Sequence, residues 1–422
     1  MRKEEKGITL VALIITIVVM LILVAVSLNV LVNSNLIGHA EKTGDAYSGA
    51  IKNEEKLGND GITINDKEYA SIDDYIESRK PLPEGAGERF SETKEYNDGT
   101  KTAWIPAGFT VSGIRGETTI EGGLVIYDIP DGSTVDWDNK TIKLPSESET
   151  KEIKTAVNQF VWIPVEVNKT TEPKDTETSI ASFYRSKWAN NARTTVVDSE
   201  YTEPNTTNDT DDKTGIASQI ENLTKSIYKY GGFYIGRYEA GSETERKSSK
   251  TEVTTLGIKQ DMYPYNNVKW GDSMSSIGEV GAVALSNSLY NSSNYGATSM
   301  LCTGACWDSM LDFIKNTKNV TSSADWGNHS DAEFDITRGK YAECANGIGS
   351  FTPVDGTYYT KKIYSVSKKY ILLTTGATER NSAKNIYDVA GNCYEWTTES
   401  YSSYGRVLRG RQLQQRWFWP SS

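Results

Sequence analysis

The segment from Ile8 to Asn35 contains no charged residue, and this feature constrains the chain more than any other. As a helix rising ~1.5 Å per residue, its apolar part ITLVALIITIVVMLILVAVSLNVLV exceeds the ~30 Å hydrocarbon core of a bilayer. We therefore expect residues 8–35 to form one transmembrane helix after a charged leader, residues 1–7. A cleaved signal peptide is the alternative, but such apolar regions are usually only roughly 7 to 15 residues long.

Basic residues predict the orientation of this helix. The leader contains Arg2, Lys3 and Lys6, and no comparable basic cluster lies just beyond the span. Positive charge favours the cytoplasmic side of a membrane. We expect a single-pass protein of the cell membrane, in contact with lipid, whose large C-terminal part is extracellular.

The junction between leader and span has the sequence K-G-I-T-L-V-A-L. It resembles the processing site of type IV prepilins, G-F-T-L-I-E-L. The resemblance implies that a prepilin peptidase cleaves after Gly7, exposes Ile8 as an N-methylated terminus, and yields a partner for other pilus subunits. The usual glutamate at the fifth mature position is Ala12 here, so a charge used in assembly is missing. A minor or unassembled pilin-like protein is the expectation, with a plain membrane anchor as the alternative.

Beyond the span, the composition is that of an acidic soluble protein. Over the whole chain, Lys and Arg total 45 against 56 Asp and Glu, a net charge of -11. No basic stretch outside the leader is large enough to hold nucleic acid, so we expect no nucleic-acid partner.

Composition also divides the chain into parts. We expect an α+β protein with a helical tether over residues 36–80, a Pro- and Gly-rich linker over 81–95, a small β unit over 96–150, and a larger domain over 155–410. Within this domain, residues 167–215 are rich in Thr, Asn, Asp and Lys, which indicates a solvated insertion.

The densest signal lies at the end of this domain, in NIYDVAGNCYEWTTESYSSYGRVLRG. Asp388, Asn392 and Glu395 surround Gly391, where the backbone can turn its carbonyl oxygens inward. Oxygen ligands of this kind suit a hard cation such as calcium. An acidic turn closed by glycine, without a metal, is the alternative.

This stretch resembles the C-terminal signature of the formylglycine-generating enzyme (sulfatase-modifying factor) family, close to GLYDMAGNVWEWT followed by RVLRGGSW. Residues 158–165 and 232–239 resemble two strands of the family, and residues 299–308 resemble the start of one of its helices, all in the same order. The resemblance implies a C-type-lectin-like fold with little regular structure, which serves both enzymes and ligand-binding proteins. It also implies one structural calcium ion, bound by the carboxylates of Asp388 and Glu395 and the backbone carbonyls of Gly391 and Cys393.

The counts of histidine and cysteine argue against catalysis. The two histidines are His39, in the expected tether, and His329, so the domain cannot supply a two-histidine iron site. The family's oxidases bind copper through a cysteine pair after the R-G-G motif, and no cysteine follows Cys393. A formylglycine-generating-type oxidoreductase, or another metal-dependent enzyme, is therefore the less favoured alternative.

The cysteine spacing Cys302-x3-Cys306 predicts two side chains on one helix face about 6 Å apart, a separation that allows a disulfide only with strain. We expect two small buried residues packing under Trp307 instead. The disulfide states of these two, of Cys344 and of Cys393 stay open.

Tyrosines near the signature are candidates for ligand contact. Tyr394, Tyr401 and Tyr404 lie closest to the expected ligand face, and tyrosine offers large amphipathic area at low entropy cost. The segment 411–422, RQLQQRWFWPSS, departs from the family pattern. Its codons, shifted by one nucleotide, can spell the glycine- and asparagine-rich sequence of the family, which predicts a frameshifted tail.

Together these features predict a membrane-anchored bacterial surface protein with a non-catalytic, lectin-like domain for recognition or adhesion. The expected ligand is a surface protein or a glycan. A purely structural pilus subunit is a further alternative.

Overall fold

The computed structural model describes residues 62–64, 67–69, 71–167, 203, 215–246, 256–270, 281–290, 295–318, 320, 326–328, 335–336, 338–344, 347–356, 358–359, 370–400 and 406–410. The expected leader, the span over 8–35, Tyr401, Tyr404 and the segment 411–422 lie outside these residues. Within the described ranges, every helix is too short or too polar to cross a membrane. The chain forms two compact units, Met1–Pro81 and Leu82–Ser422.

The first unit ends in a β-hairpin and a short helix. Strand β1 (Ile62–Ile64) pairs antiparallel with β2 (Lys67–Tyr69), and helix α3 (Ile72–Arg79) follows. The prediction of helix throughout residues 36–80 is therefore wrong for this hairpin. Asn65 and Asp66, between two runs of strand-forming residues, favour a turn over a helix.

The second unit is built on a four-stranded antiparallel sheet in the order β11-β10-β6-β5. Its strands are β5 (Thr110–Val111), β6 (Val125–Tyr127), β10 (Gln159–Pro164) and β11 (Gly232–Gly236). Val161 of β10 is paired with Val125 on one side and with Ile235 on the other. The strands expected within 158–165 and 232–239 are confirmed.

This sheet joins segments that the sequence analysis separated. Strands β5 and β6 come from the expected small β unit, and β10 and β11 come from the expected larger domain. Residues of the expected linker pair with the same sheet, because the amide of Gly87 donates to the Val111 carbonyl at 3.1 Å. The structure thus differs from the predicted division, and residues 82–422 form one unit.

Alternating side chains give the sheet an apolar cluster on each face. Val125 and Val161 point into the larger cluster, whereas Ile126 and Trp162 point into the other. The larger cluster also takes up Trp307, Met310 and Ile314 of a helix that packs on this face. The core therefore lies on both sides of β6 and β10.

The remaining elements are short. The helices are α4 (Ile153–Ala156), α5 (Ile216–Tyr230), α6 (Ala282–Leu289), α7 (Gly304–Ile314) and the 3-10 turn η3 (Glu379–Asn381). Two further sheets have three antiparallel strands each: β8 (Thr141–Lys143) lies between β7 (Thr134–Asp136) and β9 (Thr150–Glu152), and β15 (Lys340–Cys344) lies between β16 (Thr352–Pro353) and β18 (Tyr370–Leu373). The other strands form antiparallel pairs: β3 (Lys94–Asn97) with β4 (Thr102–Ile105), β12 (Gly241–Ser242) with β13 (Tyr263–Pro264), and β14 (Asp335–Ile336) with β17 (Tyr358–Tyr359). Near the end of the unit, β19 (Ser382–Ala383) pairs with β20 (Ile386–Tyr387), and β21 (Glu395–Ser400) pairs with β22 (Arg406–Arg409).

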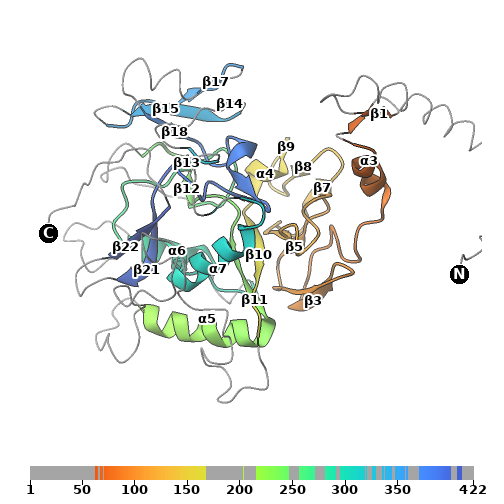
Figure 1. The fold of residues 1–422 in the computed structure, drawn as a ribbon, viewed down its shortest axis with the longest axis horizontal. Coiled ribbons are helices and arrows are strands. Elements are labelled where there is room, and N and C mark those ends of the chain that lie inside the picture. The colour runs from red at the N-terminus through yellow and green to blue at the C-terminus, as the bar shows by residue number, and fades with distance from the viewer. Residues whose placement is uncertain are drawn as a thin grey trace, which may run out of the picture. The chain divides into compact units, whose positions relative to one another are not determined.

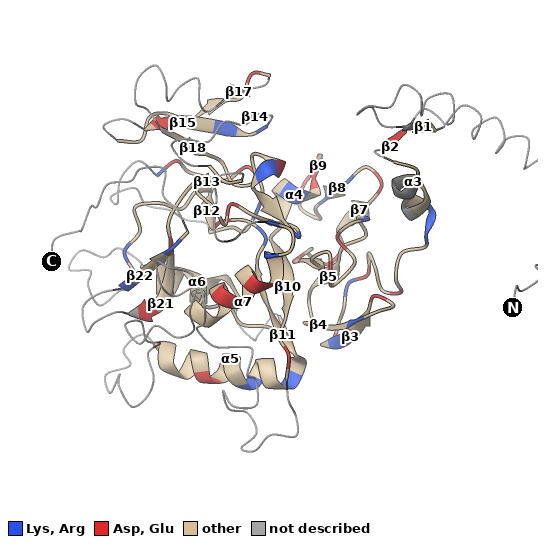
Figure 2. Ribbon diagram, in the orientation of Figure 1, with Lys and Arg blue, Asp and Glu red and all other residues tan. Residues whose placement is uncertain are grey.

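The fold is mixed α+β, with many small antiparallel sheets and long irregular connections. Hairpin β21–β22 lies beside α7 (Figure 1), where Gly304 of the helix packs against the Glu399 side chain of the hairpin. Acidic and basic residues are interspersed along the described elements (Figure 2), as in the exposed Lys225–Glu221 pair of α5.

Candidate functional site

The loop between β20 and β21, residues 388–394, has an unusual backbone. Asp388 and Asn392 both have a φ of 60°, a left-handed conformation that Asp and Asn tolerate better than most residues. Gly391 has a φ of 97°, and a Cβ there would lie 2.0 Å from the carbonyl oxygen of Asn328. That oxygen accepts a hydrogen bond from the Asn392 amide at 3.0 Å. Only glycine at 391 permits this close approach of the two backbone segments.

Asn392 connects the loop to three other segments. Its side-chain nitrogen donates to Glu239 Oε2 at 2.7 Å, just after β11. Its side-chain oxygen accepts from the Leu373 amide of β18 at 2.9 Å and from the Asn328 side chain at 3.1 Å. Asn392 is 1% exposed, so these bonds are made in the interior, where they fix the loop firmly.

Glu239, the last residue of the block 232–239, is a site residue to which the sequence pattern assigned no role. Its Oε1 accepts from the Cys393 amide at 3.0 Å, while Oε2 binds Asn392. Burial and the charge of Asp388 raise the pKa of this carboxyl well above its ordinary value. Its position immediately after a strand, near two other acidic residues of a distant loop, is visible only in three dimensions.

Asp388 is an acceptor in a buried turn. Its Oδ2 accepts from the Gly376 amide at 2.7 Å, and its Oδ1 accepts from the Asn381 side chain at 3.2 Å. Burial raises its pKa to about 6 despite these two hydrogen bonds.

Glu395 is the third carboxylate of the cluster. Burial raises its pKa well above the ordinary value, and the charges of Glu239 and Asp388 raise it further. Its Oε2 is buried and has no hydrogen-bond partner among the described residues. A Cβ placed on Gly410 would lie 2.4 Å from this oxygen and 3.4 Å from the Cys393 carbonyl oxygen. A carboxylate oxygen and a backbone carbonyl oxygen therefore border the same small space.

This arrangement can be compared with the expected calcium ligands. Glu395 Oε2 and the Cys393 carbonyl fit, because they are neighbouring hard oxygen atoms and the carboxylate oxygen is unpaired. Asp388 adds negative charge nearby, although both its oxygens accept hydrogen bonds. In the part of the chain that is described, no three or more His, Cys, Asp or Glu side chains are arranged to hold a metal ion. A cation here would depend on few carboxylates together with backbone carbonyls and water.

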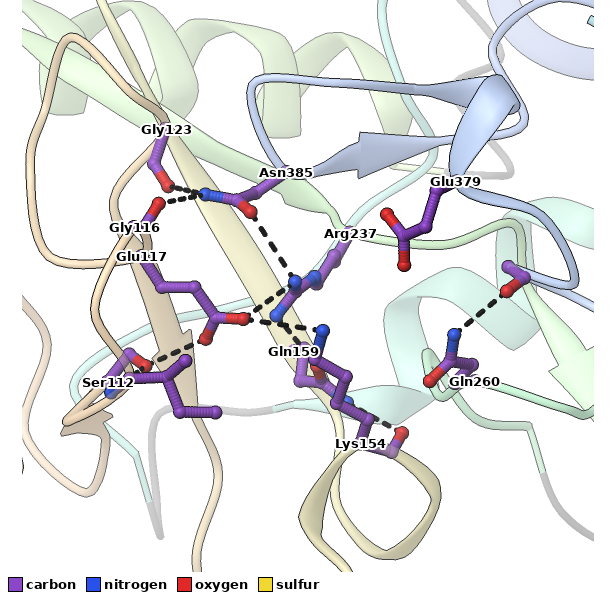
Figure 3. Close-up of polar contacts among 12 residues, drawn as sticks. Ser112, Gly116, Glu117, Gly123, Lys154, Gln159, Arg237, Gln260, Glu379 and Asn385 are labelled. Carbon is purple, nitrogen blue, oxygen red and sulfur yellow. Dashed lines mark hydrogen bonds and ion pairs between the residues drawn. The ribbon is translucent and has the colours of Figure 1, made fainter. Parts of the chain in front are cut away.

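A second buried network fixes the beginning of the stretch, at Asn385 (Figure 3). The Asn385 side-chain nitrogen donates to the carbonyls of Gly116 at 2.9 Å and Gly123 at 2.8 Å. Its oxygen lies 3.5 Å from Nη2 of Arg237, which donates to Glu117 Oε1 at 2.8 Å. Arg237 is 1% exposed, so this ion pair is fully buried. The network ties the candidate loop to the central sheet.

Burial alone would raise the pKa of Glu117, but the charge and hydrogen bond of Arg237, aided by Lys154, lower it to about 2. Its second oxygen accepts from the hydroxyls of Ser112 and Tyr127, each at 2.7 Å. The pair is thus surrounded by partners, as a buried charge requires.

The end of the loop and the hairpin that follows it each expose a large apolar side chain. Tyr394 and Leu408 are each 42% exposed, and they are the large exposed apolar residues in the described part of the second unit. Arg406, two residues before Leu408, stacks over the Trp270 ring at 3.8 Å. Alternation along β22 places Arg406 and Leu408 on its outer face, with Val407 and Arg409 buried. Of the three tyrosines expected to contact ligand, only Tyr394 lies within the described residues.

All four cysteines are free thiols. Cys306 is buried in the same apolar cluster as Trp307, as expected. The prediction that Cys302 lies on the same helix is wrong, because Thr303 caps the helix by accepting from the Cys306 amide and α7 begins at Gly304.

Comparisons with protein-family models, with curated proteins and with solved structures find no match to this chain.

Proposed function

We propose that the chain is a membrane-anchored, pilin-like surface protein whose second unit recognises an extracellular protein or glycan and does not act as an enzyme. The anchor is the uncharged segment 8–35, and the proposed fold of the recognition unit is that of the formylglycine-generating enzyme family, a C-type-lectin-like fold. The order of the four sequence blocks supports this fold.

One observation supports recognition more than any other. The large apolar side chains that the described part of the second unit exposes are Tyr394, the last residue of the buried loop, and Leu408, in strand β22 of the hairpin that follows it. Exposed apolar residues beside a rigid turn and a stacked arginine are typical of a binding face, since aromatic and arginine side chains dominate binding energy at interfaces. Trp396 is cross-strand from Leu408 and anchors this face by donating from Nε1 to the Val268 carbonyl at 3.0 Å.

Calcium has a supporting role in this proposal. Glu395 and the carbonyls of Gly391 and Cys393 would hold one ion, and Asp388 would contribute negative charge. A bound cation would neutralise the cluster formed by Glu239, Asp388 and Glu395 and keep the loop in one conformation. The unpaired Glu395 Oε2 supports this role.

The test is ligand capture on protein and glycan arrays by the full-length chain in detergent. Tyr394→Ala and Leu408→Ala should each weaken capture by a factor of about 5 or more, corresponding to at least ~1 kcal/mol. Ile76→Ala is the matched control, because Ile76 is 51% exposed and belongs to the first unit. Equal capture by all three variants would contradict recognition at this face. Stoichiometric copper or iron in the purified protein would instead favour an enzyme.

A further inference from the structure

The start of helix α7 brings two thiols together. Thr303 is the N-cap residue, so Cys302 directly precedes the cap and Cys306 is the third residue of the helix. A residue before the cap commonly folds back over the first helical turn. Both cysteines belong to the same apolar cluster, and their thiols share a hydrogen bond.

The position of Cys302 outside the helix changes what this pair can do. Two cysteines on one helix face would be held at a fixed and unfavourable separation. Cys302 has no such restriction, because the Thr303 backbone is extended, with φ -82° and ψ 161°. Both thiols are reduced in the structure, and Cys302 is the more accessible, being half-buried where Cys306 is 6% exposed.

We propose that Cys302 and Cys306 form a reversible intramolecular disulfide, with a low-molecular-weight disulfide such as oxidised glutathione as the oxidant. The Cys302 thiolate attacks one sulfur of the oxidant, giving a mixed disulfide and releasing one small thiol. The Cys306 thiolate then attacks the Cys302 sulfur, which closes the protein disulfide and releases the second small thiol. Each cysteine loses one proton, each leaving thiolate gains one, and the oxidant accepts both electrons.

The surroundings predict how fast this reaction is. The hydrogen bond that the neutral Cys302 thiol shares with Cys306, its burial, and the charges of Cys306, Glu203 and Glu399 raise the pKa of Cys302 well above its ordinary value. Because the thiolate is the attacking species, oxidation should be slow near neutral pH and faster in alkali. Arg409 moderates this effect by binding Glu399 at 2.8 Å and 2.9 Å.

The disulfide would fix a junction between the helix and the C-terminal hairpin. The Cys302 carbonyl accepts from the Thr398 amide of β21 at 3.0 Å, and the Gly304 amide donates to Glu203 Oε1 at 2.6 Å. Joining Cys302 to the first turn of α7 would therefore hold β21 in place through Thr398. This inference concerns the thiols alone and stands whether or not the hairpin binds a ligand.

The test is peptide mapping of the full-length chain in detergent after equilibration with oxidised and reduced glutathione. Trypsin should release one peptide, Trp270 to Lys315, that contains Cys302 and Cys306 and neither other cysteine. We expect this peptide to lose two hydrogen atoms, to resist N-ethylmaleimide, and to recover both thiols with dithiothreitol. The Cys306→Ala variant should stop at a glutathione adduct on Cys302.

Two cysteines this close in sequence can form a disulfide even in an unfolded chain. A comparison with the chain unfolded in urea therefore shows how much the fold itself favours the disulfide. The equilibrium constant for disulfide formation should be at least about tenfold higher in the native chain than in the unfolded chain. An equal constant in both states would overturn the proposal. So would a native wild-type chain in which both thiols remain open to alkylation, or one that ends as a stable glutathione adduct on Cys302.

Discussion

Replacing Arg237 with methionine should destabilise the second unit strongly. The methionine fills much of the same volume but leaves the buried Glu117 without its closest cation, which lies 2.8 Å away in the native chain. Lys154 Nζ remains, but at 3.5 Å. Removing one partner of a buried ion pair typically costs about 3 to 5 kcal/mol, because the other charge stays buried.

The pKa of Glu117 gives an independent magnitude. It falls from 4.5 to about 2 in the folded chain. At ~1.36 kcal/mol per pH unit, this difference corresponds to about 3 kcal/mol of stability near neutral pH. Because the folded-state pKa is depressed, this stability is present above pH ~4.5 and is lost as the pH falls toward ~2. The cost of Arg237→Met should therefore shrink in acid.

Urea unfolding, followed by tryptophan fluorescence at pH ~7 and pH ~4, measures both effects. Lys225→Met is the matched control, since Lys225 lies 2.7 Å from Glu221 in a pair whose side chains are 53% and 58% exposed. The control should cost much less, because an exposed helix pair contributes little to stability. If Arg237→Met costs no more than the control, or costs equally at both pH values, the reasoning is refuted.

Two further predictions concern the candidate loop. Gly391→Ala should destabilise the chain by several kcal/mol, because its Cβ would meet the Asn328 carbonyl. Gly99→Ala, where φ is similar at 94° and the surrounding space is open, should cost only about 1 to 2 kcal/mol. Thermal unfolding compares the two variants, and equal losses of stability would show that the close approach is unimportant. In the presence of a chelator, the free energy of unfolding should fall as the pH rises from ~4 to ~7, because the folded-state pKa of about 6 for Asp388 favours its protonated form by about 3 kcal/mol. Calcium should remove this fall in the native chain but not in the Glu395→Gln variant. A melting temperature that changes with neither calcium nor pH would exclude the calcium site.

Short-range patterns predicted much of the scaffold. The aliphatic and aromatic runs of β10 and β11 fall inside the expected strands, and Thr303 with Gly304 begins the helix expected near residues 299–308. Helix α5 was not among the expected elements, although the sequence contains a local signal for it. Ile216, Ile220, Leu223 and Ile227 recur with helical spacing between Gly215 and Gly231, which end the helix at both sides.

Contacts between distant segments could not be predicted in the same way. Glu117 and Arg237 are separated by 120 positions, and Glu239 and Asn392 by 153. No periodicity in either segment indicates its partner, because each local pattern is satisfied by any apolar surface that faces it. The polar stretch before β10 likewise predicted a boundary between domains. In the structure, β6 precedes this stretch and pairs with β10, which follows it, so the two segments share one sheet.

These long-range contacts explain how three carboxylates, those of Glu239, Asp388 and Glu395, can be buried close together around the loop. A buried carboxylate normally requires a cation or several donors, and Glu117 has both. Glu239 and Asp388 have donors from the backbone and from asparagines, and Glu395 has an unpaired buried oxygen. Raised pKa values at all three residues follow from this difference. The Arg237 network fixes the beginning of the loop and Asn392 fixes its end, so the loop cannot open to hydrate these carboxylates. Protonation, or a cation beside Glu395, is then the remaining way to lower the cost of their charge.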